Sequence, residues 1–499
     1  MTPTVIVVGA GPVGLMLAGE LRLGGVDVAV YEQLDAPTGE SRGVGFTRRA
    51  AEVFDQRGLL ARVSGGEVGD EVHFGGVRID PGILPDKHFS VRGVPQYQTE
   101  AMLEEWVREL GVPVLRGHRL TGLHQTPDEV VAVFDGPDGR TEKAARHLVG
   151  CDGGRSTVRG LTGIDFPGSE ATRAMYVADV AGVDIRPRPS GERVPGGMVM
   201  AVRLERGVTR IIIHPDALPP GTVGRVTARE VAAAWRDLTG QSLRAEDLRW
   251  VSAFTDATRQ AAEYRRGRVL LAGDACHIHI PAGAQGLSLG VQDAVNLGWK
   301  LAAVTGGRAP EGLLDTYHAE RHPVGARVLR NTLAQSRLYL TGEEMEPMRV
   351  VLRELVTRPD AAFRLAAQIS GVDVRYDMGG PGHPLLGLRL PPDWELDLPG
   401  GRRRVADLLH AARGVFIDAA GSREALDRVS GWSDRIDVVA GAWAPVPGDD
   451  RPATLEQVLV RPDGYIAWAA PGGDVRDALA RWFGAARISA SAAAGPADT

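Results

Sequence analysis

The alternation of hydrophobic and polar positions in residues 4 to 32 predicts a strand, a helix and a second strand. A β-branched apolar run at Val5 to Val8 leads into a glycine-rich stretch. Apolar residues at helical spacing, among them Leu17 and Leu21, follow it and end at a Gly-Gly pair. A second apolar run, Val28 to Tyr31, closes at an acid. This order is typical of a βαβ unit whose two strands are parallel.

Two later stretches repeat the pattern of a buried strand that ends in an acid beside a glycine. The first, within residues 146 to 159, runs into Asp152-Gly153 and a helix start. The second is the strand Val269 to Ala272, which is followed by Gly273-Asp274, a loop and a long helix from about Leu287. Because such strands form parallel sheets, we expect both acids at the carboxyl edge of one sheet, where ligands bind.

The middle of the chain changes to a period of two, which predicts an antiparallel sheet. Residues 174 to 214 alternate in this way, and Glu205-Arg206-Gly207 predicts a hairpin turn between two of the runs. Residues 248 to 257 add a further strand to the sheet. The segment 311 to 340 has a helical pattern.

The last quarter of the chain predicts a separate unit behind a linker. Residues 379 to 401 are rich in proline and glycine, which is typical of a linker. Beyond it short strands and helices alternate, with strands expected at 414 to 417, 436 to 439 and 457 to 460 and helices at 406 to 411 and 475 to 483. The small and polar residues 489 to 499 predict a disordered tail.

Length and composition are those of a globular protein with several domains. The chain has 499 residues, of which 43% are hydrophobic and 24% charged, and its length predicts about three domains. A net charge of −6 argues against nucleic acid as a partner, and no apolar run approaches the roughly 18 residues of a membrane helix. The first residues lack the positive region of a secretory signal, and Cys151 and Cys276 are too few for a disulfide framework. These features predict a cytoplasmic setting.

The glycine-rich turn after the first strand has the spacing GxGxxG of a dinucleotide-binding loop. Gly9 permits the tight turn, Gly11 lets the backbone approach a pyrophosphate, and Gly14 lets the helix pack on the strand. The helix start offers free N–H groups and a positive dipole end to phosphate. Glu32 lies 23 residues after Gly9, where its carboxylate can accept both hydroxyls of a ribose. The motif predicts an adenine dinucleotide but does not distinguish NAD from FAD.

Residues 273 to 286, with the sequence GDACHIHIPAGAQG, allow three interpretations. His277 and His279 form an HxH pair that can bind metal, but only a cysteine and an aspartate lie near them, so we predict no metal site. Cys276 and His277 could act as a nucleophile and its base, but adjacent side chains seldom converge and cysteine is mostly a small buried residue. The third interpretation is a cofactor loop in which both histidines pack or hydrogen-bond.

The GxGxxG, Asp152-Gly153 and Gly273-Asp274 motifs, in this order, resemble the FAD-dependent aromatic hydroxylases of the para-hydroxybenzoate hydroxylase type. The closer likeness is to the actinobacterial aromatic-polyketide hydroxylases that act on angucyclines and anthracyclines, and rifampicin monooxygenases are also similar. The likeness is detailed over residues 1 to 170 and 250 to 340. It implies that the stretch 273 to 286 is a flavin loop.

The resemblance implies an α/β fold in which a Rossmann-like FAD-binding domain carries an inserted antiparallel β-sheet substrate domain and a C-terminal thioredoxin-like domain. The implied boundaries are 1–173 and 265–380 for the FAD-binding domain, 174–264 for the substrate domain, 381–400 for the linker and 401–499 for the thioredoxin-like domain with its tail. Both cysteines precede the last domain, which is therefore redox-inert. The inserted sheet would roof the substrate cavity, and its apolar residues Met198, Met200, Ile211 and Ile213 either line that cavity or belong to the core.

The resemblance also implies a set of cofactor contacts. Asp274 would hold the ribityl and pyrophosphate region, Pro281 would lie beside the reactive flavin edge, and the helix start at Gly286 would point N–H groups at the flavin N1–C2=O edge, where reduced flavin carries negative charge. The full set is Gly9, Gly11, Pro12, Val13, Gly14, Glu32, Gln33, Arg42, Gln96, Asp152, Gly153, Gly273, Asp274, Pro281, Gly286, Leu287 and Ser288. Gln98 is the alternative to Gln96. No catalytic base is identified, and Pro281 and Gly286 are the residues expected at the flavin edge.

The implied reaction is NADPH- and FAD-dependent hydroxylation of a polycyclic aromatic polyketide by O2, through a flavin C4a-hydroperoxide, in antibiotic biosynthesis. No second GxGxxG follows a strand, so NADPH would bind only transiently. The alternatives are a Baeyer–Villiger or epoxidising monooxygenase on the same scaffold, a rifampicin-type antibiotic-modifying monooxygenase, an FAD oxidoreductase without oxygen transfer and a non-catalytic flavin-binding subunit. We expect neither nucleic acid nor membrane as a partner, and a monomer or homodimer.

Overall fold

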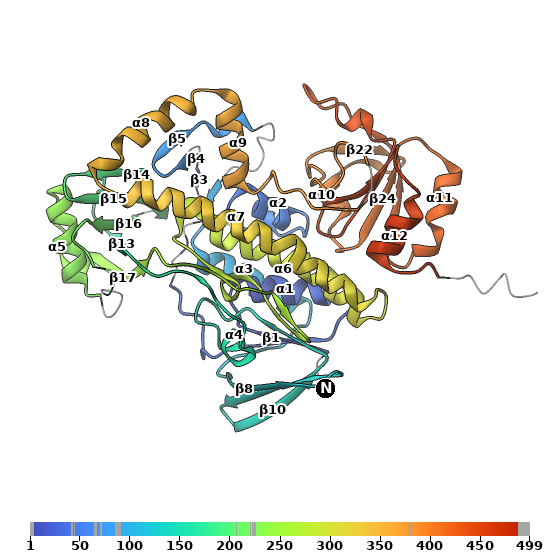
Figure 1. Ribbon diagram of the computed structural model, residues 1–499, viewed down its shortest axis with the longest axis horizontal. Helices are drawn as coiled ribbons and strands as arrows, with labels where there is room; N and C mark the ends of the chain where they lie inside the picture. The colour runs from blue at the N-terminus through green and yellow to red at the C-terminus, as the bar shows by residue number, and fades with distance from the viewer. Residues whose placement is uncertain are drawn as a thin grey trace, which may run out of the picture.

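The computed structural model describes residues 4–40, 43, 45–63, 67–69, 72–84, 91–205, 207–219, 221, 226–379 and 382–487. Three sequence predictions fall on residues outside these ranges, namely the flavin contact Arg42, the centre of the hairpin turn at Arg206 and the tail 489 to 499. Figure 1 shows the C-terminal unit on one side of the molecule and the sheet that contains β13 to β17 on the other, with the helices α1, α6 and α7 between them.

A six-stranded sheet with the order β19-β20-β11-β1-β2-β7 forms the centre of the first unit, and only its edge strand β19 is antiparallel to its neighbour. Its strands are β1 Val5–Val8, β2 Val28–Tyr31, β7 Val114–Leu115, β11 His147–Gly150, β19 Arg265–Arg266 and β20 Val269–Leu271. β1 and β2 have their predicted bounds, whereas β20 ends one residue before the predicted Ala272. Because β1, β11 and β20 are neighbours, the GxGxxG turn after β1 meets the Asp152-Gly153 and Gly273-Asp274 motifs at one edge of the sheet, where both acids were predicted.

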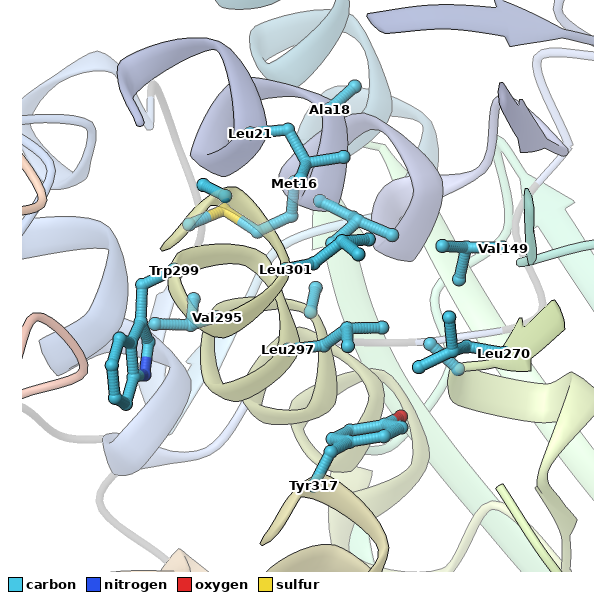
Figure 2. Close-up of a cluster of buried hydrophobic side chains, with 14 of the residues drawn as sticks. Met16, Ala18, Leu21, Val149, Leu270, Val295, Leu297, Trp299, Leu301 and Tyr317 are labelled. Atoms are coloured by element: carbon cyan, nitrogen blue, oxygen red, sulfur yellow. The ribbon is translucent and has the colours of Figure 1, made fainter. Parts of the chain in front are cut away.

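Four long helices pack on this sheet and on one another. They are α1 Pro12–Leu23, α3 Gln96–Glu109, α6 Gln285–Thr305 and α7 Asp315–Leu340. Figure 2 shows Met16 and Leu21 of α1 with Leu297 and Leu301 of α6 and the sheet residues Val149 and Leu270 in one core. α1 and α6 approach so closely that a Cβ at Gly298 would lie 2.4 Å from the Cβ of Glu20. Burial of each large apolar side chain in such a core stabilises the fold by about 1.5–3 kcal/mol.

The first unit also contains smaller elements, of which the sequence predicts only the start of the helix Thr157–Thr162. A three-stranded antiparallel sheet below the main sheet is attached through Tyr31, which stacks on Phe134 with ring centroids 4.2 Å apart. Its strands are β8 Arg119–Gln125, β9 Val130–Gly136 and β10 Gly139–Ala145. The other short elements are α2 Arg48–Asp55, β3 Glu67–Gly69, β4 Val72–Phe74, β5 Val77–Ile79, β6 Val91–Gly93, α4 Thr157–Thr162, β12 Gly168–Ser169, β18 Thr258–Gln260 and β21 His277–Ile278.

The predicted antiparallel sheet has five strands, in the order β14-β15-β16-β13-β17. They are β13 Ala174–Ala181, β14 Arg188–Val194, β15 Gly197–Glu205, β16 Val208–Pro215 and β17 Leu248–Thr255. Helix α5, Ala228–Thr239, covers one face and packs on Ile211 and Ile213. Met198 and Met200 project from the other face, because side chains alternate along a strand. The predicted group of four residues is therefore divided, with the methionines at a cavity and the isoleucines in the core.

Two helices and a hairpin close the molecule above this sheet. Helices α8 Glu346–Leu355 and α9 Pro359–Ser370 follow α7, and the hairpin of β4 and β5 packs against them in an apolar cluster with Leu338 and Ile369. Within the described residues, none of the helices combines the length and the apolar character needed to cross a bilayer.

The C-terminal unit is a four-stranded sheet flanked by helices, which confirms the predicted thioredoxin-like α/β arrangement. The strand order is β25-β24-β27-β28, with β24 and β25 parallel and the other pairs antiparallel. The elements are α10 Val405–Leu408, β24 Gly414–Asp418, α11 Arg423–Val429, β25 Ile436–Ala440, β27 Gln457–Val460, β28 Ile466–Ala469 and α12 Val475–Phe483. The helix expected at 406 to 411 ends at Leu408, and β28 and α11 were not predicted.

A small second sheet lies partly inside the predicted linker. It consists of β22 Glu395–Leu398, β23 Gly401–Arg404 and β26 Ala442–Trp443. Trp394 and Leu396 are buried in the core of the C-terminal unit, so ordered structure begins before residue 400. Prolines and glycines mark turns as well as linkers, so their abundance here is compatible with ordered structure. The domain boundaries remain predictions.

Buried ion pairs join the C-terminal unit to the first unit. Arg461, in the turn between β27 and β28, contacts Glu320 of α7 at 2.7 Å, and Glu320 contacts Lys300 of α6 at 2.9 Å. Arg57 pairs with Glu20 and also donates to the backbone oxygens of Leu409 and Pro462. These ion pairs between the two units are therefore shielded from solvent.

Candidate active site

The GxGxxG turn is shaped by two glycines that have no room for a side chain. Gly9 has a φ of 105°, and a Cβ there would lie 2.5 Å from the backbone oxygen of Cys151. A Cβ at Gly14 would lie 2.0 Å from the backbone oxygen of Gly9. Gly11 differs, since a Cβ there would meet nothing within 4 Å. Gly9 and Gly14 allow β1, β11 and α1 to come together, and Gly11 leaves an open cradle at the start of α1.

Glu32 is held next to this turn at the end of β2. Its Oε2 accepts the N–H of Ala10 at 2.8 Å, and its Oε1 accepts the N–H of Leu34 at 2.9 Å. The carboxylate is therefore fixed beside the glycine loop, where the sequence predicts a ribose partner. The neighbouring Gln33 is exposed.

The end of β11 separates the roles of Asp152 and Gly153. Asp152 accepts the hydroxyl of Ser156 at 2.5 Å and the N–H of Val158 at 3.0 Å, so its carboxylate caps the start of α4. Burial raises the pKa of Asp152, although the hydrogen bond from Ser156 acts in the opposite direction. Gly153 has a φ of 78° and an open side that faces the cavity.

The Gly273-Asp274 turn at the end of β20 lies against the GxGxxG turn. A Cβ at Gly273, where φ is 65°, would lie 2.9 Å from the side chain of Val13. Asp274 follows it in a short 3-10 helix, Gly273–Ala275, and lines the same cavity as Gly11 and Val13. Residues far apart in the sequence are thus brought together at the carboxyl edge of the sheet, where the sequence places the cofactor.

The loop that leads into α6 contains the predicted flavin-edge residues. Pro281 is followed by a 3-10 turn, Ala282–Ala284, in which Gly283 and Ala284 both have positive φ. Pro281, Gly286 and Leu287 line the cavity. Ser288 does not line it, because its hydroxyl accepts the N–H of Thr47 at 2.8 Å and so connects α6 to the start of α2.

The two histidines of this loop face different surroundings. His277 is buried, and its Nε2 lies 2.7 Å from Asp293, whose other carboxylate oxygen accepts from Arg321 at 2.7 Å. Burial alone raises the pKa of Asp293, but Arg321 and His277 lower it below its ordinary value. His279 contacts the backbone oxygen of Ile280 at 2.7 Å, and burial lowers its pKa to about 4.

Among the described residues, this geometry supplies neither the additional ligands that a metal site at the two histidines would need nor a base directed at Cys276. Among the residues that the structure describes, no group of three or more histidine, cysteine or acidic side chains is placed to hold a metal ion. Cys276 is buried, which raises the pKa of its thiol well above the ordinary value, and the adjacent His277 is directed to Asp293. The loop therefore contributes backbone and packing to the site.

One cavity of about 760 Å³ connects all of these motifs. At one end lie the three glycine and acid turns with Gln96, and at the other end an apolar wall from the five-stranded sheet and α7. Of the predicted cofactor contacts, the cavity is lined by Gly11, Pro12, Val13, Gln96, Gly153, Asp274, Pro281, Gly286 and Leu287. Gln98 does not line it, and its side chain donates to the hydroxyl of Tyr97. Gly9, Gly14, Glu32, Asp152, Gly273 and Ser288 lie behind this lining and shape it.

The apolar end of the cavity contains two polar residues that sequence reasoning missed. His73 of β4 and Tyr339 of α7 both line it, and the Tyr339 Oη lies 2.7 Å from Nδ1 and 3.1 Å from Nε2 of His73. Their neighbours are Met175, Met198, Met200, Ile212 and Leu340. No local motif marks this pair, because the two residues are 266 positions apart in the chain.

The residues at the first end of the cavity fit FAD. Gly11 and Gly153 both leave open space where a Cβ would stand, and both border the cavity. The starts of α1 and α6 have no side-chain cap, so their first N–H groups are available to a ligand. Two such helix starts suit the pyrophosphate and the electron-rich N1–C2=O edge of a flavin dinucleotide.

Comparison with known proteins agrees with this geometry. Residues 2–332 match the FAD binding domain family, and residues 383–486 match the family of the C-terminal domain of aromatic-ring hydroxylases. A 12-dehydrotetracycline 5-monooxygenase/anhydrotetracycline 6-monooxygenase from Streptomyces rimosus is 43% identical, over 96% of this chain and 98% of that protein. A rifampicin monooxygenase from Streptomyces venezuelae is 43% identical, over 97% of this chain and 99% of its own length. The crystal structure of CabE, an aromatic hydroxylase from angucycline biosynthesis, superposes with a TM-score of 0.93 at 53% identity and covers 98% of this chain and 100% of that one.

Proposed function

The chain belongs to the family of FAD-dependent aromatic-ring hydroxylases, and from this premise we propose that it inserts one oxygen atom of O2 into a polycyclic phenolic polyketide. The observation that carries the proposal is the single cavity of about 760 Å³ that joins the cofactor motifs to an apolar wall. A reactive ring edge and a flat apolar substrate can meet in such a cavity. The relatives that act on tetracycline and angucycline intermediates support this substrate class and a place in antibiotic biosynthesis.

The chain's own residues would bind and orient the cofactor. The cradle at Gly11 and the start of α1 suit the pyrophosphate, and Glu32 suits the ribose. Asp274 lines the same cavity as Gly11, where it suits the ribityl and pyrophosphate region. FAD, when bound, supplies the electron transfer and the oxygen activation. The protein supplies positioning and a water-poor surface, which limits side reactions of reactive species.

The apolar wall suits a large flat substrate. Met175, Met198 and Met200 line it, and methionine adapts its flexible thioether to irregular ring systems. Ile212 and Leu340 extend this apolar surface. Such a surface selects by shape and apolar area, which favours several fused rings over a single phenol.

NADPH, O2 and the quaternary state belong to the proposal as well. A nicotinamide donor would bind transiently, since the sequence contains one GxGxxG turn after a strand. Reduction of FAD without substrate would then waste the donor, so bound substrate should speed the reduction. Stopped-flow measurement of flavin bleaching by NADPH, with and without a tetracyclic phenol, checks this. We place the protein in the cytoplasm as a monomer or homodimer.

Aerobic turnover with NADPH tests the proposed reaction. Tetracyclic and angucyclic phenols, rifampicin and a single-ring phenol are offered separately under labelled O2, and products are analysed by mass. We expect one labelled oxygen in the polycyclic phenols. Labelled rifampicin alone would assign the protein to the antibiotic-modifying type, to which the relative from Streptomyces venezuelae points. NADPH oxidation without label in any product would contradict the monooxygenase proposal.

A further inference from the structure

His73 and Tyr339 form a hydrogen-bonded polar pair in the mostly apolar substrate wall, which Arg203 of β15 also lines. The imidazole of His73 is half-buried on β4, and Tyr339 is buried on α7, with the two rings edge to face at a centroid distance of 5.5 Å. The Tyr339 hydroxyl donates to the backbone oxygen of Ser190 on β14 at 3.0 Å. Three segments from separate parts of the chain therefore fix the position of one imidazole at the cavity.

This pair lies beside the predicted flavin edge. β4 is next to the turn Ala282–Ala284, and the ring of Tyr339 packs in one apolar cluster with Ile280 and Ala282. The same cluster contains Met175, Met198 and Ile212 of the substrate wall. A phenol that rests on the methionines with its reacting carbon toward Pro281 would have its hydroxyl within reach of this end of the wall.

The hydrogen bonds of Tyr339 suit a neighbouring imidazole that changes its protonation. A tyrosine hydroxyl has one hydrogen, and Ser190 receives it. The oxygen can therefore accept an N–H from His73, which is present on both nitrogens once the imidazole is protonated. Burial raises the pKa of Tyr339 well above its ordinary value, so Tyr339 stays neutral and does not compete for the proton.

The other ionisable side chains among the described residues that line the cavity are less suited to accept a proton from a phenol. Arg203 has no lone pair to offer, and Asp274 and Cys151 belong to the cofactor end. His279 points its Nδ1 at Ile280, and its Nε2 is buried without a hydrogen-bond partner in the described structure. His73 is the remaining base, and imidazole is the side chain whose ordinary titration lies closest to neutral pH.

We propose that His73 is the general base of the hydroxylation and that Tyr339 is the positioning residue that holds it. The O–H bond of the substrate phenol breaks, the electron pair stays on the phenolate oxygen, and the proton moves to an imidazole nitrogen. Phenolate formation raises the electron density of the ring, which is what transfer of an electrophilic oxygen requires. After oxygen transfer, the C–H bond at the hydroxylated carbon breaks, its proton leaves to water, and its electron pair restores the aromatic ring as the carbonyl oxygen becomes a phenolate. The imidazolium of His73 then returns its proton to that oxygen. This assignment rests on the proposed function, because it requires a phenolic substrate.

Titration of a coloured phenol bound to the oxidised holoenzyme tests the assignment. The probe is 1,2-dihydroxyanthraquinone, a planar tricyclic phenol whose phenolate absorbs at wavelengths where oxidised flavin absorbs little. We expect the wild-type enzyme to lower the apparent pKa of the bound phenol relative to the free compound. His73→Gln should raise that apparent value by about one unit or more, and Tyr339→Phe should raise it by less, because the base remains but is no longer held.

Arg203→Gln is the matched control, since Arg203 lines the same cavity and its charge could stabilise a phenolate without any base. The proposal would be overturned if Arg203→Gln changed the apparent pKa of the bound phenol and His73→Gln did not. In turnover, the acidic limb of kcat/KM against pH should be lost in His73→Gln, and added imidazole should partly restore the rate of His73→Ala. A purely structural role of His73 would produce neither effect.

The titration uses neither NADPH nor oxygen transfer, so it separates the two levels of the proposal. A titrating phenol that depends on His73 together with an absence of labelled product would support the base and contradict the hydroxylation. Failure of the probe and of tetracyclic phenols to bind would overturn the substrate class and this assignment together. Labelled product with an unchanged pH profile in His73→Gln would overturn the base alone.

Discussion

Ala284 has a left-handed backbone conformation, with a φ of 55°, directly before the first residue of α6. The adjacent Gly283 has a φ of 69°. A left-handed conformation costs an alanine on the order of 1 kcal/mol more than a glycine. This strain lies in the loop between Pro281 and Gly286, so it forms part of the cavity lining.

Ala284→Gly should therefore stabilise the protein by about 1 kcal/mol, because glycine adopts the same conformation without a Cβ clash. Thermal melting of the two proteins, followed by circular dichroism, measures the difference. Gly283→Ala is the matched control, since it places a Cβ in the same kind of conformation and 3.2 Å from the side chain of Gln285. We expect it to lower the melting temperature, and an unchanged value for both variants would contradict the strain.

His279 makes stability depend on pH. In the unfolded chain its pKa is near 6.5, whereas burial lowers the folded pKa to about 4. Between these values the unfolded chain binds a proton that the folded protein does not, so the free energy of unfolding falls as the pH falls from 6.5 to 4. His279→Gln should reduce that fall by on the order of 2 kcal/mol. Melting temperatures across this pH range measure it, with the exposed His124→Gln as control, and parallel curves for wild type and His279→Gln would contradict the effect.

Single-residue roles were predictable where the backbone pattern determines them. The requirement for glycine at positions 9 and 14 was predicted from the turn between a strand and a helix, and the structure shows no room for a side chain at either position. The task of Asp152 was not predictable, because capping of α4 depends on Ser156 and Val158 being in place. His73 and Tyr339 could not be recognised at all, since only the folded chain makes them neighbours.

At the scale of elements, local patterns predict the strands and helices of the sheets with parallel strands best. β1, β2, β27 and α12 have their predicted bounds, because each is a short apolar or amphipathic run between clear turn signals. β8 and β10 were missed because their side chains are mostly polar or exposed, so no clean alternation marks them. The burial of Trp394 and Leu396, within the stretch rich in proline and glycine, could not be predicted, because it depends on contacts with residues further along the chain.

The turn between β27 and β28 anchors the C-terminal unit through Arg461. Its guanidinium contacts Glu320 and Asp463, all three side chains being buried. Burial alone would raise the pKa of Glu320. Arg461 and Lys300 have the larger, opposite effect, so the pKa lies below its ordinary value and the carboxylate stays charged. Arg461 also lies over the ring of Trp482 in α12, at 4.6 Å from its centroid.

Arg461→Leu should lower the free energy of unfolding by about 3 kcal/mol, because it leaves two buried carboxylates with less compensation. Thermal or denaturant unfolding measures the loss. Arg428→Leu is the matched control, since the pair of Arg428 with Glu424 is an exposed i, i+4 contact on the same unit. It should change stability by less than about 0.5 kcal/mol. Equal losses in the free energy of unfolding for the two substitutions would show that the buried contacts of Arg461 stabilise the protein no more than an exposed ion pair does.

At the scale of the whole molecule, the binding site and the stability of the protein depend on different parts of the chain. All described residues that line the cavity lie between Gly11 and Ile369, so the C-terminal unit contributes none of them. That unit nevertheless covers α6 and α7, and both helices contribute residues to the cavity lining. Trp299 of α6 packs on Trp482 and Phe483 of α12, and Arg49 donates to the backbone oxygen of Asp463.

A chain that ends at residue 380 should therefore keep the FAD site but lose stability. Glu320, Arg57 and Arg49 would lose buried partners, and Trp299 would lose its cover, so we expect the melting temperature to fall by about 10 °C or more. Because every lining residue remains, FAD at about 100 times its Kd should still stabilise the shortened chain by about 2.7 kcal/mol, as it does the full chain. Thermal shift measurements of both chains with and without FAD check the two statements. A shortened chain that melts cooperatively but does not respond to FAD would show that the C-terminal unit helps to form the cofactor site.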